Sequence, residues 1–230
     1  MKKDRFISVL TLGLAISACG QQSASPQTKP ADSGPTLAAT MQFIQEKLSE
    51  KGRTGWAETL SNQPGIIRRS FTQLTDVMAD PAACTLYTTE ATDKTIELPK
   101  GKVLKPGGPL TADDLQTHTV ETDTISFKQA EKVTVEKMQN LRNEVFADAA
   151  HPDVTATVTP EVFYLKLSAS NAVFSIHHSI TKGTQAPVED DKNSKFDGYI
   201  FGDEESANKV AKAMIHAMEL CGGGAKKELF

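Results

Sequence analysis

The sequence predicts an α+β fold, in which a curved antiparallel sheet or a partly open barrel is combined with one N-terminal helix and one C-terminal capping helix. Two stretches near the ends of the folded part repeat apolar residues at helical spacing. Between them, several short stretches alternate with a period of two, and brief turns separate them. Short strands of this kind, followed by a final helix, favour a sheet that is antiparallel.

The first predicted helix covers residues 36–50, and Gly52 ends it. Its apolar stripe consists of Leu37, Met41, Ile44 and Leu48. The last helix follows Asp203, a predicted N-cap, and has two glutamates in its first turn, where the helix dipole favours negative charge. Gly222 is the predicted C-cap. The stripe of this helix consists of Ala207, Val210, Ala211, Met214, Met218 and Cys221.

The chain between these helices is predicted to form short strands, one further helix and two loops. The strands cover 66–77, 83–89, 94–98, 118–127, 131–137, 161–168, 173–180 and 199–201. Strands 161–168 and 173–180 are expected to form a hairpin, because only a short turn separates them. The helix covers 138–149, and the loops cover 100–110 and 182–197.

The N-terminus has the three parts of a secretory signal peptide. Residues 1–5 are cationic, residues 6–17 are mainly apolar, and small residues precede Cys19. The apolar run is too short to cross a bilayer, which needs roughly 20 residues. The residues Ile16-Ser17-Ala18-Cys19 resemble the lipobox of bacterial lipoproteins, although Leu is commoner than Ile at the first of these positions.

The lipobox resemblance implies that residues 1–18 are a signal peptide and that the sulfur of Cys19 carries a diacylglycerol with fatty acids such as palmitate. Gly20 directly after the lipidated cysteine then implies the outer membrane of the cell envelope. Residues 19–35 are rich in Ser, Gln and Pro and are expected to form a flexible tether. The alternative is an ordinary signal peptide cut near Ala18, with Cys19 as a passenger thiol.

Residues 36–224 are expected to form a single folded domain, followed by a tail, 225–230. The whole chain has 25 Lys and Arg and 29 Asp and Glu. Cleavage would remove three basic residues and one acidic residue, which leaves 22 and 28 and a net charge of −6. An acidic surface argues against binding to nucleic acid or to anionic lipid.

The two remaining cysteines, Cys84 and Cys221, are predicted to form a disulfide bond, because an exported protein folds where disulfides persist. Cys84 shares a strand face with Leu86, and Cys221 continues the apolar stripe of the last helix. Both side chains are therefore expected to point inward. The alternative is two separate buried thiols.

The sequence contains none of the motifs GxSxG, HExxH, CxxC or GxxxxGK, so no enzyme activity, catalytic residue, cofactor or metal site is predicted from it. His177 and His178 are adjacent in a strand and should point to opposite faces, which prevents them from sharing one ion. The acidic stretch 189–193 lacks the spacing of a calcium loop and is interpreted as a solvated loop. Asp113 and Asp114 are interpreted as a turn or helix start.

The order of elements from Phe71 to Cys221 resembles that of pleckstrin-homology-type barrels, in which a helix caps a bent sheet. We expect a non-enzymatic domain that binds a protein or peptide partner in the envelope. One alternative is a carrier of a small apolar ligand or lipid, with a cavity lined by Phe163, Leu165, Phe174 and Ile176. Another is a hydrolase, which requires His118 or His178 beside a serine or a carboxylate in a cleft.

Overall fold

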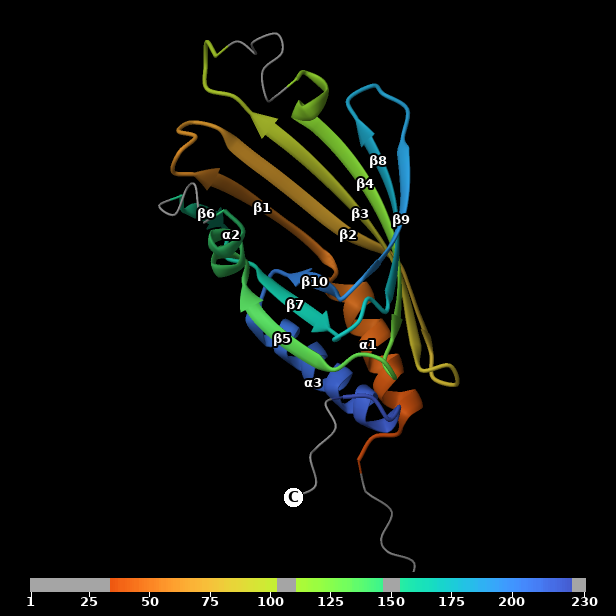
Figure 1. Cartoon of the computed structure of the whole chain (residues 1–230). Coiled ribbons are helices and arrows are strands. Elements are labelled where there is room, and N and C mark those ends of the chain that lie inside the picture. The colour runs from red at the N-terminus through yellow and green to blue at the C-terminus, as the bar shows by residue number, and fades with distance from the viewer. Residues whose placement is uncertain (1–33, 103–110, 147–153, 225–230) are drawn as a thin grey trace, which may run out of the picture. The chain divides into compact units, whose positions relative to one another are not determined.

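The computed structural model describes residues 34–102, 111–146 and 154–224, and from Pro35 on these belong to one compact unit (Figure 1). The predicted signal peptide, Cys19, most of the predicted tether and residues 225–230 lie outside the described residues. The elements are α1 (Leu37–Lys51), β1 (Arg53–Leu60), β2 (Ile67–Asp80), β3 (Thr85–Glu97), the 3-10 helix η1 (Asp113–Leu115), β4 (Gln116–Ser126), β5 (Lys132–Lys137), α2 (Met138–Phe146), β6 (Ala156–Thr159), β7 (Phe163–Ser168), β8 (Phe174–Lys182), β9 (Val188–Ser194), β10 (Phe196–Phe201) and α3 (Glu204–Leu220).

The strands form two antiparallel sheets, and neither closes into a barrel. The large sheet has seven strands in the order β6-β1-β2-β3-β4-β8-β9, and the small sheet has three in the order β10-β7-β5. The expected α+β class, with an antiparallel sheet, an N-terminal helix and a C-terminal helix, is confirmed. None of the described helices is long and apolar enough to span a membrane.

Both long helices begin within one residue of their predicted starts, and Gly52 ends α1 as predicted, whereas the C-cap of α3 is Cys221, one residue before the predicted Gly222. The hydroxyl oxygen of Thr36 accepts a hydrogen bond from the amide of Ala39 at 3.3 Å and caps α1. Asp203 Oδ1 accepts from the amide of Ser206 at 2.7 Å and caps α3. At the other end of α3, Gly222 has a φ of 76°, a left-handed conformation that glycine adopts without strain.

One hydrophobic core joins α1, α3 and both sheets. The helices contribute Met41, Ile44, Leu48, Ala207, Val210, Met214 and Met218, the large sheet contributes Leu74, Val77, Leu86, Ile125 and Phe174, and the small sheet contributes Phe163, Leu165, Leu167, Tyr199 and Phe201. The helices and the small sheet lie against one end of the large sheet, and the long strands run on past them (Figure 1). The other end of the same strands therefore remains available for a site.

Burial along single strands marks the boundary between these two halves. In β3 the residues Thr85, Leu86 and Thr88 are buried, whereas from Thr89 to the end of the strand the residues are intermediate or exposed. In β4 the order is reversed, as antiparallel pairing requires, and Asp123 and Ile125 near its end are the buried residues. The core thus ends at the middle of the large sheet.

The predicted disulfide between Cys84 and Cys221 is confirmed, with 6.0 Å between the two Cα atoms. The prediction for Cys84 was wrong in one respect, since this residue precedes β3 rather than lying in a strand, and it has a φ of 59°. Its side chain is nevertheless buried. The bond joins the start of β3 to the C-terminal end of α3.

The predicted hairpin of 161–168 and 173–180 was wrong. β7 pairs with β5 and β10 in the small sheet, whereas β8 pairs with β4 and β9 in the large sheet. The turn between them carries the chain from one sheet to the other. A turn of this length is compatible with a hairpin or with such a crossing, and only the packing of the two sheets decides between them.

Other differences concern polar strands. The expected loop 182–197 contains β9, whose residues are almost all exposed, and 83–89 and 94–98 are parts of the single strand β3. The strands β1 and β6 were not predicted. Backbone pairing holds β9 in the sheet without a buried apolar face, whereas β6 alternates, with Ala156 and Val158 buried, but has only four residues. The predicted helix 138–149 is α2 up to Phe146; its last residues, and 103–110 of the predicted loop, lie outside the described part of the chain.

Candidate functional site

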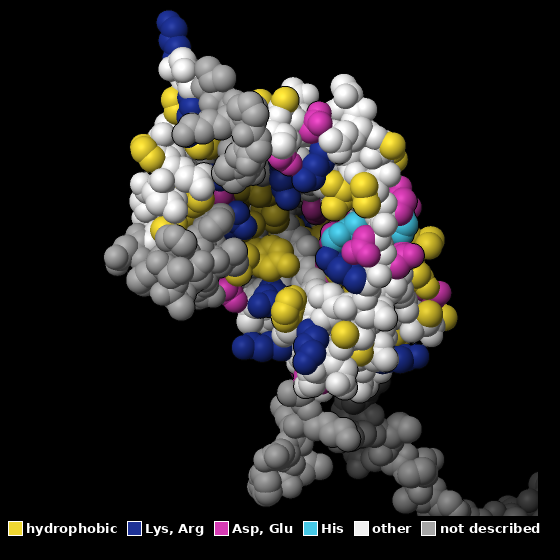
Figure 2. Space-filling view, turned by 45° about the horizontal axis from the view of Figure 1, so that its top comes forward, with side chains coloured by type: hydrophobic (Ala, Val, Ile, Leu, Met, Phe, Trp, Pro, Cys, Tyr) yellow, Lys and Arg dark blue, Asp and Glu magenta, His cyan; other side chains and the backbone are white. Residues whose placement is uncertain are grey.

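A cleft of about 520 Å³ lies over the half of the large sheet that the core leaves open (Figure 2). Its lining comes from both sheets, from α2 and from η1. The lining residues are Trp56, Glu58, Arg68, Ser70, Glu90, Thr92, Lys94, Thr95, Ile96, Asp114, Thr117, Thr119, Glu121, Met138, Leu141, Arg142 and Ile200. This volume is within the range of pockets that bind small molecules or short peptide segments.

One wall of the cleft is apolar. Trp56, Leu141 and Ile200 are partly buried there and pack on a small hydrophobic cluster that includes Met138. The rest of the lining carries charges of both signs and five hydroxyl groups. Figure 2 shows this mixture as a hollow with hydrophobic side chains in its floor and with lysine, arginine and acidic side chains around it.

Amide side chains hold α2 beside the cleft. Gln139 Oε1 accepts from the amide of Val158 at 2.9 Å, and its Nε2 donates to the carbonyl of Ala156. Asn143 Oδ1 accepts from the amide of Ala156 at 2.8 Å. These hydrogen bonds give partners to backbone amide and carbonyl groups of the edge strand β6. They also fix the position of α2, so that Leu141 and Arg142 lie in the lining of the cleft.

Glu58 and the two arginines near it form the charged wall beside α2. Arg142 donates to both carboxylate oxygens of Glu58, with Nε to Oε2 at 2.5 Å, and the Glu58 side chain is only 4 % exposed. Arg68 lies directly opposite Glu58 in the pairing of β1 and β2. Its Nη2 donates to Gln63, but its buried Nη1 has no hydrogen-bond partner among the described residues. Arg68 Nη1 is therefore a donor that a ligand can use.

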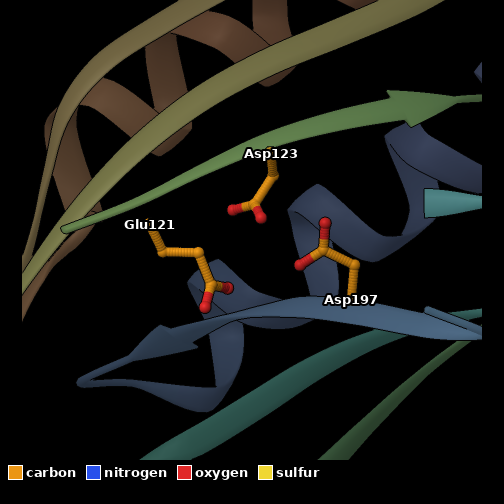
Figure 3. A group of neighbouring side chains, drawn as sticks. All are labelled: Glu121, Asp123 and Asp197. Carbon is orange, nitrogen blue, oxygen red and sulfur yellow. The ribbon is translucent and has the colours of Figure 1, made fainter. Parts of the chain in front are cut away.

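Three carboxylates come together where the cleft meets the core. One oxygen each of Glu121, Asp123 and Asp197 lies within 4.8 Å of the other two. Glu121 and Asp123 are two residues apart in β4 and so share its inner face, while Asp197 comes from β10 in the small sheet. Figure 3 shows the carboxylates of Asp123 and Asp197 turned toward one another, with that of Glu121 beside them.

Asp123 and Asp197 are held by few partners. Thr88 donates to Asp123 Oδ2 at 3.5 Å, and the Thr88 hydroxyl lies 3.2 Å from that of Tyr199. Asp197 Oδ1 accepts from the amide of Gly198 at 2.6 Å. The second oxygens, Asp123 Oδ1 and Asp197 Oδ2, are buried without a hydrogen-bond partner in the described part of the chain.

Glu121 lies between a histidine and a second glutamate. His178 of β8 and Glu90 of β3 are its direct neighbours across the large sheet, and His178 Nε2 forms an ion pair with Glu121 Oε2. Two carboxylates directly opposite one another repel. The His178 ring contacts the Glu121 carboxylate and orients it.

Burial and mutual repulsion raise the pKa of these acids. Burial first, and the negative charges of Asp197 and Glu121 next, raise the pKa of Asp123 to about 9. Burial raises the pKa of Asp197 to about 7, although the hydrogen bond from Gly198 opposes this change. Burial also raises the pKa of Glu90. Without a counter-ion, the site therefore holds protons near neutral pH.

In a chelating buffer, we expect the free energy of unfolding to fall as the pH rises from about 5 to about 9. The folded protein keeps protons that unfolded aspartates, with an ordinary pKa of 3.8, have already released, so each rise in pH favours the unfolded chain. The loss is at most about 1.4 kcal/mol per pH unit for each carboxyl. Urea unfolding with EDTA at several pH values measures this slope.

Asp123→Asn should reduce that slope, because an amide of the same shape does not titrate. Asp190→Asn is the matched control, since Asp190 is an exposed aspartate of β9. The assignment would be contradicted if the slope were the same in wild type and Asp123→Asn.

Of the other residues considered from the sequence, only Asp114 belongs to the lining of the cleft. His177 is on the opposite face of β8 from His178, as predicted, and pairs with Asp191 at 2.7 Å and Glu189 at 3.1 Å. The stretch 189–193 belongs to the exposed strand β9 instead of a loop. Asp113 and Asp114 begin η1. Phe163, Leu165, Phe174 and Ile176 are buried, and none of them lines the cleft.

Both histidines considered for hydrolysis do lie beside carboxylates. His178 pairs with Glu121 in the cleft, and His118 Nδ1 lies 2.7 Å from Asp93 Oδ1 on an exposed part of the sheet. Neither ring is hydrogen-bonded to a serine, threonine or cysteine within the described ranges. The sequence reasoning missed the site itself: the pattern Glu121-x-Asp123 in a strand was a usable signal, but nothing local connects it with Asp197.

The fold and the cleft together define the class: an α+β protein with an open, polar-walled cleft on its larger sheet and buried acids at the inner end. The chain matches no known protein family, no curated protein and no solved structure.

Proposed function

We propose that this chain is a lipid-anchored protein of the bacterial cell envelope, and that its folded domain binds a segment of a partner protein in the cleft without catalysing a reaction. The observation that carries the proposal is the cleft of about 520 Å³, which has one apolar wall and charged groups of both signs. A peptide presents the same mixture of apolar side chains, charges and backbone polar groups. The apolar wall and the charged groups of the cleft would therefore complement the apolar and polar groups of a bound peptide.

The composition of the lining favours a peptide over an apolar ligand. Five of the lining residues are apolar, namely Trp56, Ile96, Met138, Leu141 and Ile200, and the others bring charged and hydroxyl groups that a peptide can pair with and a lipid chain cannot. The unpartnered Arg68 Nη1 suits a backbone carbonyl or a carboxylate of the bound segment. A large aromatic residue and arginines are also the side chains that contribute most to binding at protein interfaces.

The anchor and the detailed fold type remain predictions from the sequence. The lipobox at Ile16-Ser17-Ala18-Cys19 supports attachment to a membrane, and Gly20 supports the outer membrane. The likeness to pleckstrin-homology-type barrels depends on the order of elements, in which antiparallel strands precede a closing helix. It adds to the proposal because domains with open sheets and grooves commonly bind peptides.

Site-specific photocrosslinking in the source cells tests the proposal. A crosslinking amino acid at Thr119, which lines the cleft, is expected to give discrete protein adducts. The same amino acid at Thr122, which lies on the opposite face of β4, is the matched control and should give none. Equal adducts at both positions, or no protein adduct at Thr119, would contradict binding in the cleft.

Arg68→Gln should lower the Thr119 adduct by roughly tenfold, the effect typical of removing an arginine from an interface. Arg69→Gln is the control, because Arg69 is the next residue of β2, is exposed on the other face and pairs with Glu97.

The same cells test the lipid anchor. Cys19→Ala should abolish labelling by palmitate and release the protein from the membrane fraction. If Cys19 is only a passenger thiol, Cys19→Ala should change neither the labelling nor the membrane fractionation.

A further inference from the structure

We propose that Glu121, Asp123 and Asp197 bind one calcium ion at the inner end of the cleft. The sequence alone did not predict a metal site, and the protein partner of the preceding section is not needed for this one. The inference depends on the geometry of the three carboxylates and on two of their oxygens that lack partners.

The donors favour a hard cation, and their spacing is compatible with calcium. All three are carboxylate oxygens, the ligands that hard cations such as Ca²⁺ and Mg²⁺ prefer. Calcium binds oxygen at about 2.3 to 2.6 Å, so two of its ligands on opposite sides are about 4.6 to 5.2 Å apart. Magnesium, with bonds of about 2.0 to 2.1 Å, requires at most about 4.2 Å. The observed limit of 4.8 Å allows the three oxygens to reach one calcium ion with little movement.

The partnerless oxygens are an independent sign of a ligand. Asp123 is 3 % exposed and Asp197 is 5 % exposed, yet Asp123 Oδ1 and Asp197 Oδ2 have no hydrogen-bond partner among the described residues. Buried polar atoms in folded proteins are nearly always paired, and those that are not call for an explanation such as a bound ion. In Figure 3 both aspartate carboxylates point into the space that they share.

The charge balance supports the same conclusion. Within the described ranges, none of the three carboxylates forms an ion pair with a lysine or an arginine. His178 pairs with Glu121, and Lys192 acts on Asp197 only at longer range. Glu90 adds a further acid close by. A divalent ion would neutralise most of this charge, and His178, which contacts Glu121 without reaching the ion, would orient that carboxylate.

An ion can reach the site from the cleft. The Glu121 side chain is 32 % exposed and belongs to the lining, whereas the two aspartates lie behind it. Glu121 is therefore the carboxylate that solvent and the ion meet first. Three carboxylates without a dedicated loop suggest a dissociation constant on the order of 10⁻⁴ to 10⁻³ M, as in extracellular calcium modules.

Calcium titration of the full-length protein, first freed of metal with EDTA, tests the proposal. We expect one saturable site by calorimetry, and a melting temperature that rises with CaCl₂. Terbium, a hard trivalent probe, should bind the same site and luminesce on excitation at the tyrosine band, because Tyr199 lies one hydroxyl away from Asp123. Excess calcium should displace it.

Asp123→Asn should weaken calcium binding by at least about tenfold and abolish the terbium signal, while Asp190→Asn on β9 should leave both unchanged. Glu121→Gln is a second variant at a partly exposed position, which keeps the test informative if Asp123→Asn does not fold. The proposal fails if no saturable binding is seen up to about 10 mM, well above the weakest calcium modules. It also fails if both variants bind as wild type does, or if magnesium binds equally well.

Discussion

Removal of the Cys84–Cys221 disulfide is expected to lower the free energy of unfolding by about 4 to 5 kcal/mol, a magnitude that follows from the entropy of closing so long a loop in the unfolded chain. The two cysteines are 137 residues apart in the sequence. The bond acts as a cross-link between α3, which packs on α1 and the small sheet, and the large sheet at the start of β3. Urea unfolding of Cys84→Ala, of Cys221→Ala and of the double variant measures the effect.

The three variants should be destabilised by nearly equal amounts, because each removes the same covalent bond. Wild type with a strong reductant is the matched control and should behave like the double variant. Losses that add up in the double variant would contradict the pairing, since two separate thiols contribute independently.

Gly198→Ala is expected to destabilise the protein by about 3 kcal/mol or more, as overpacking against a rigid neighbour does. A Cβ atom at Gly198 would lie 2.1 Å from the carbonyl oxygen of Leu165 and within 3 Å of the Tyr164 ring. The carbonyl belongs to β7, the central strand of the small sheet, and cannot move without disrupting its pairing with β10. Thermal unfolding of the variant measures the loss.

Gly202→Ala is the matched control, because the nearest atom to its added Cβ, Thr54 Oγ1, is 3.8 Å away. It should change stability by less than about 1 kcal/mol. Gly198 is also the neighbour of Asp197 and donates to its carboxylate at 2.6 Å. A shift of β10 in Gly198→Ala should therefore also weaken calcium binding, which Gly202→Ala should not do. Equal stability of the two variants would contradict the prediction, because it would mean that β7 can move away from the added Cβ atom at little cost in stability.

The strands show why pairing was harder to predict than the helices. The ends of α3 follow from Asp203 and Gly222, which lie within two residues of the helix in the sequence, so the sequence is sufficient to place them to within a residue. β7 and β8, by contrast, are neighbours in the chain but belong to different sheets. Which strand pairs with which depends on contacts between distant segments, and a short turn carries no information about them.

The candidate site likewise has one part that the sequence predicts and one part that depends on contacts between distant segments. Glu121 and Asp123 alternate correctly for one face of a strand, so their common direction was readable from the sequence. Asp197 lies in a stretch that was predicted to be a polar loop, and its burial beside them results from the packing of β10 across β4. The acidic stretch 189–193 looked richer in ligands, yet it is exposed and pairs with β8 instead.

By itself the sequence determined the two long helices with their caps, the pairing of the two cysteines and the α+β class, because these depend on local spacing, on composition and on the count of cysteines. Only the tertiary structure decided the division into two sheets, the open half of the larger one and the meeting of three carboxylates at its centre. The physical reason is that these features arise where segments far apart in the chain pack together. Local patterns indicate which face of each segment is buried, but not which segment covers it.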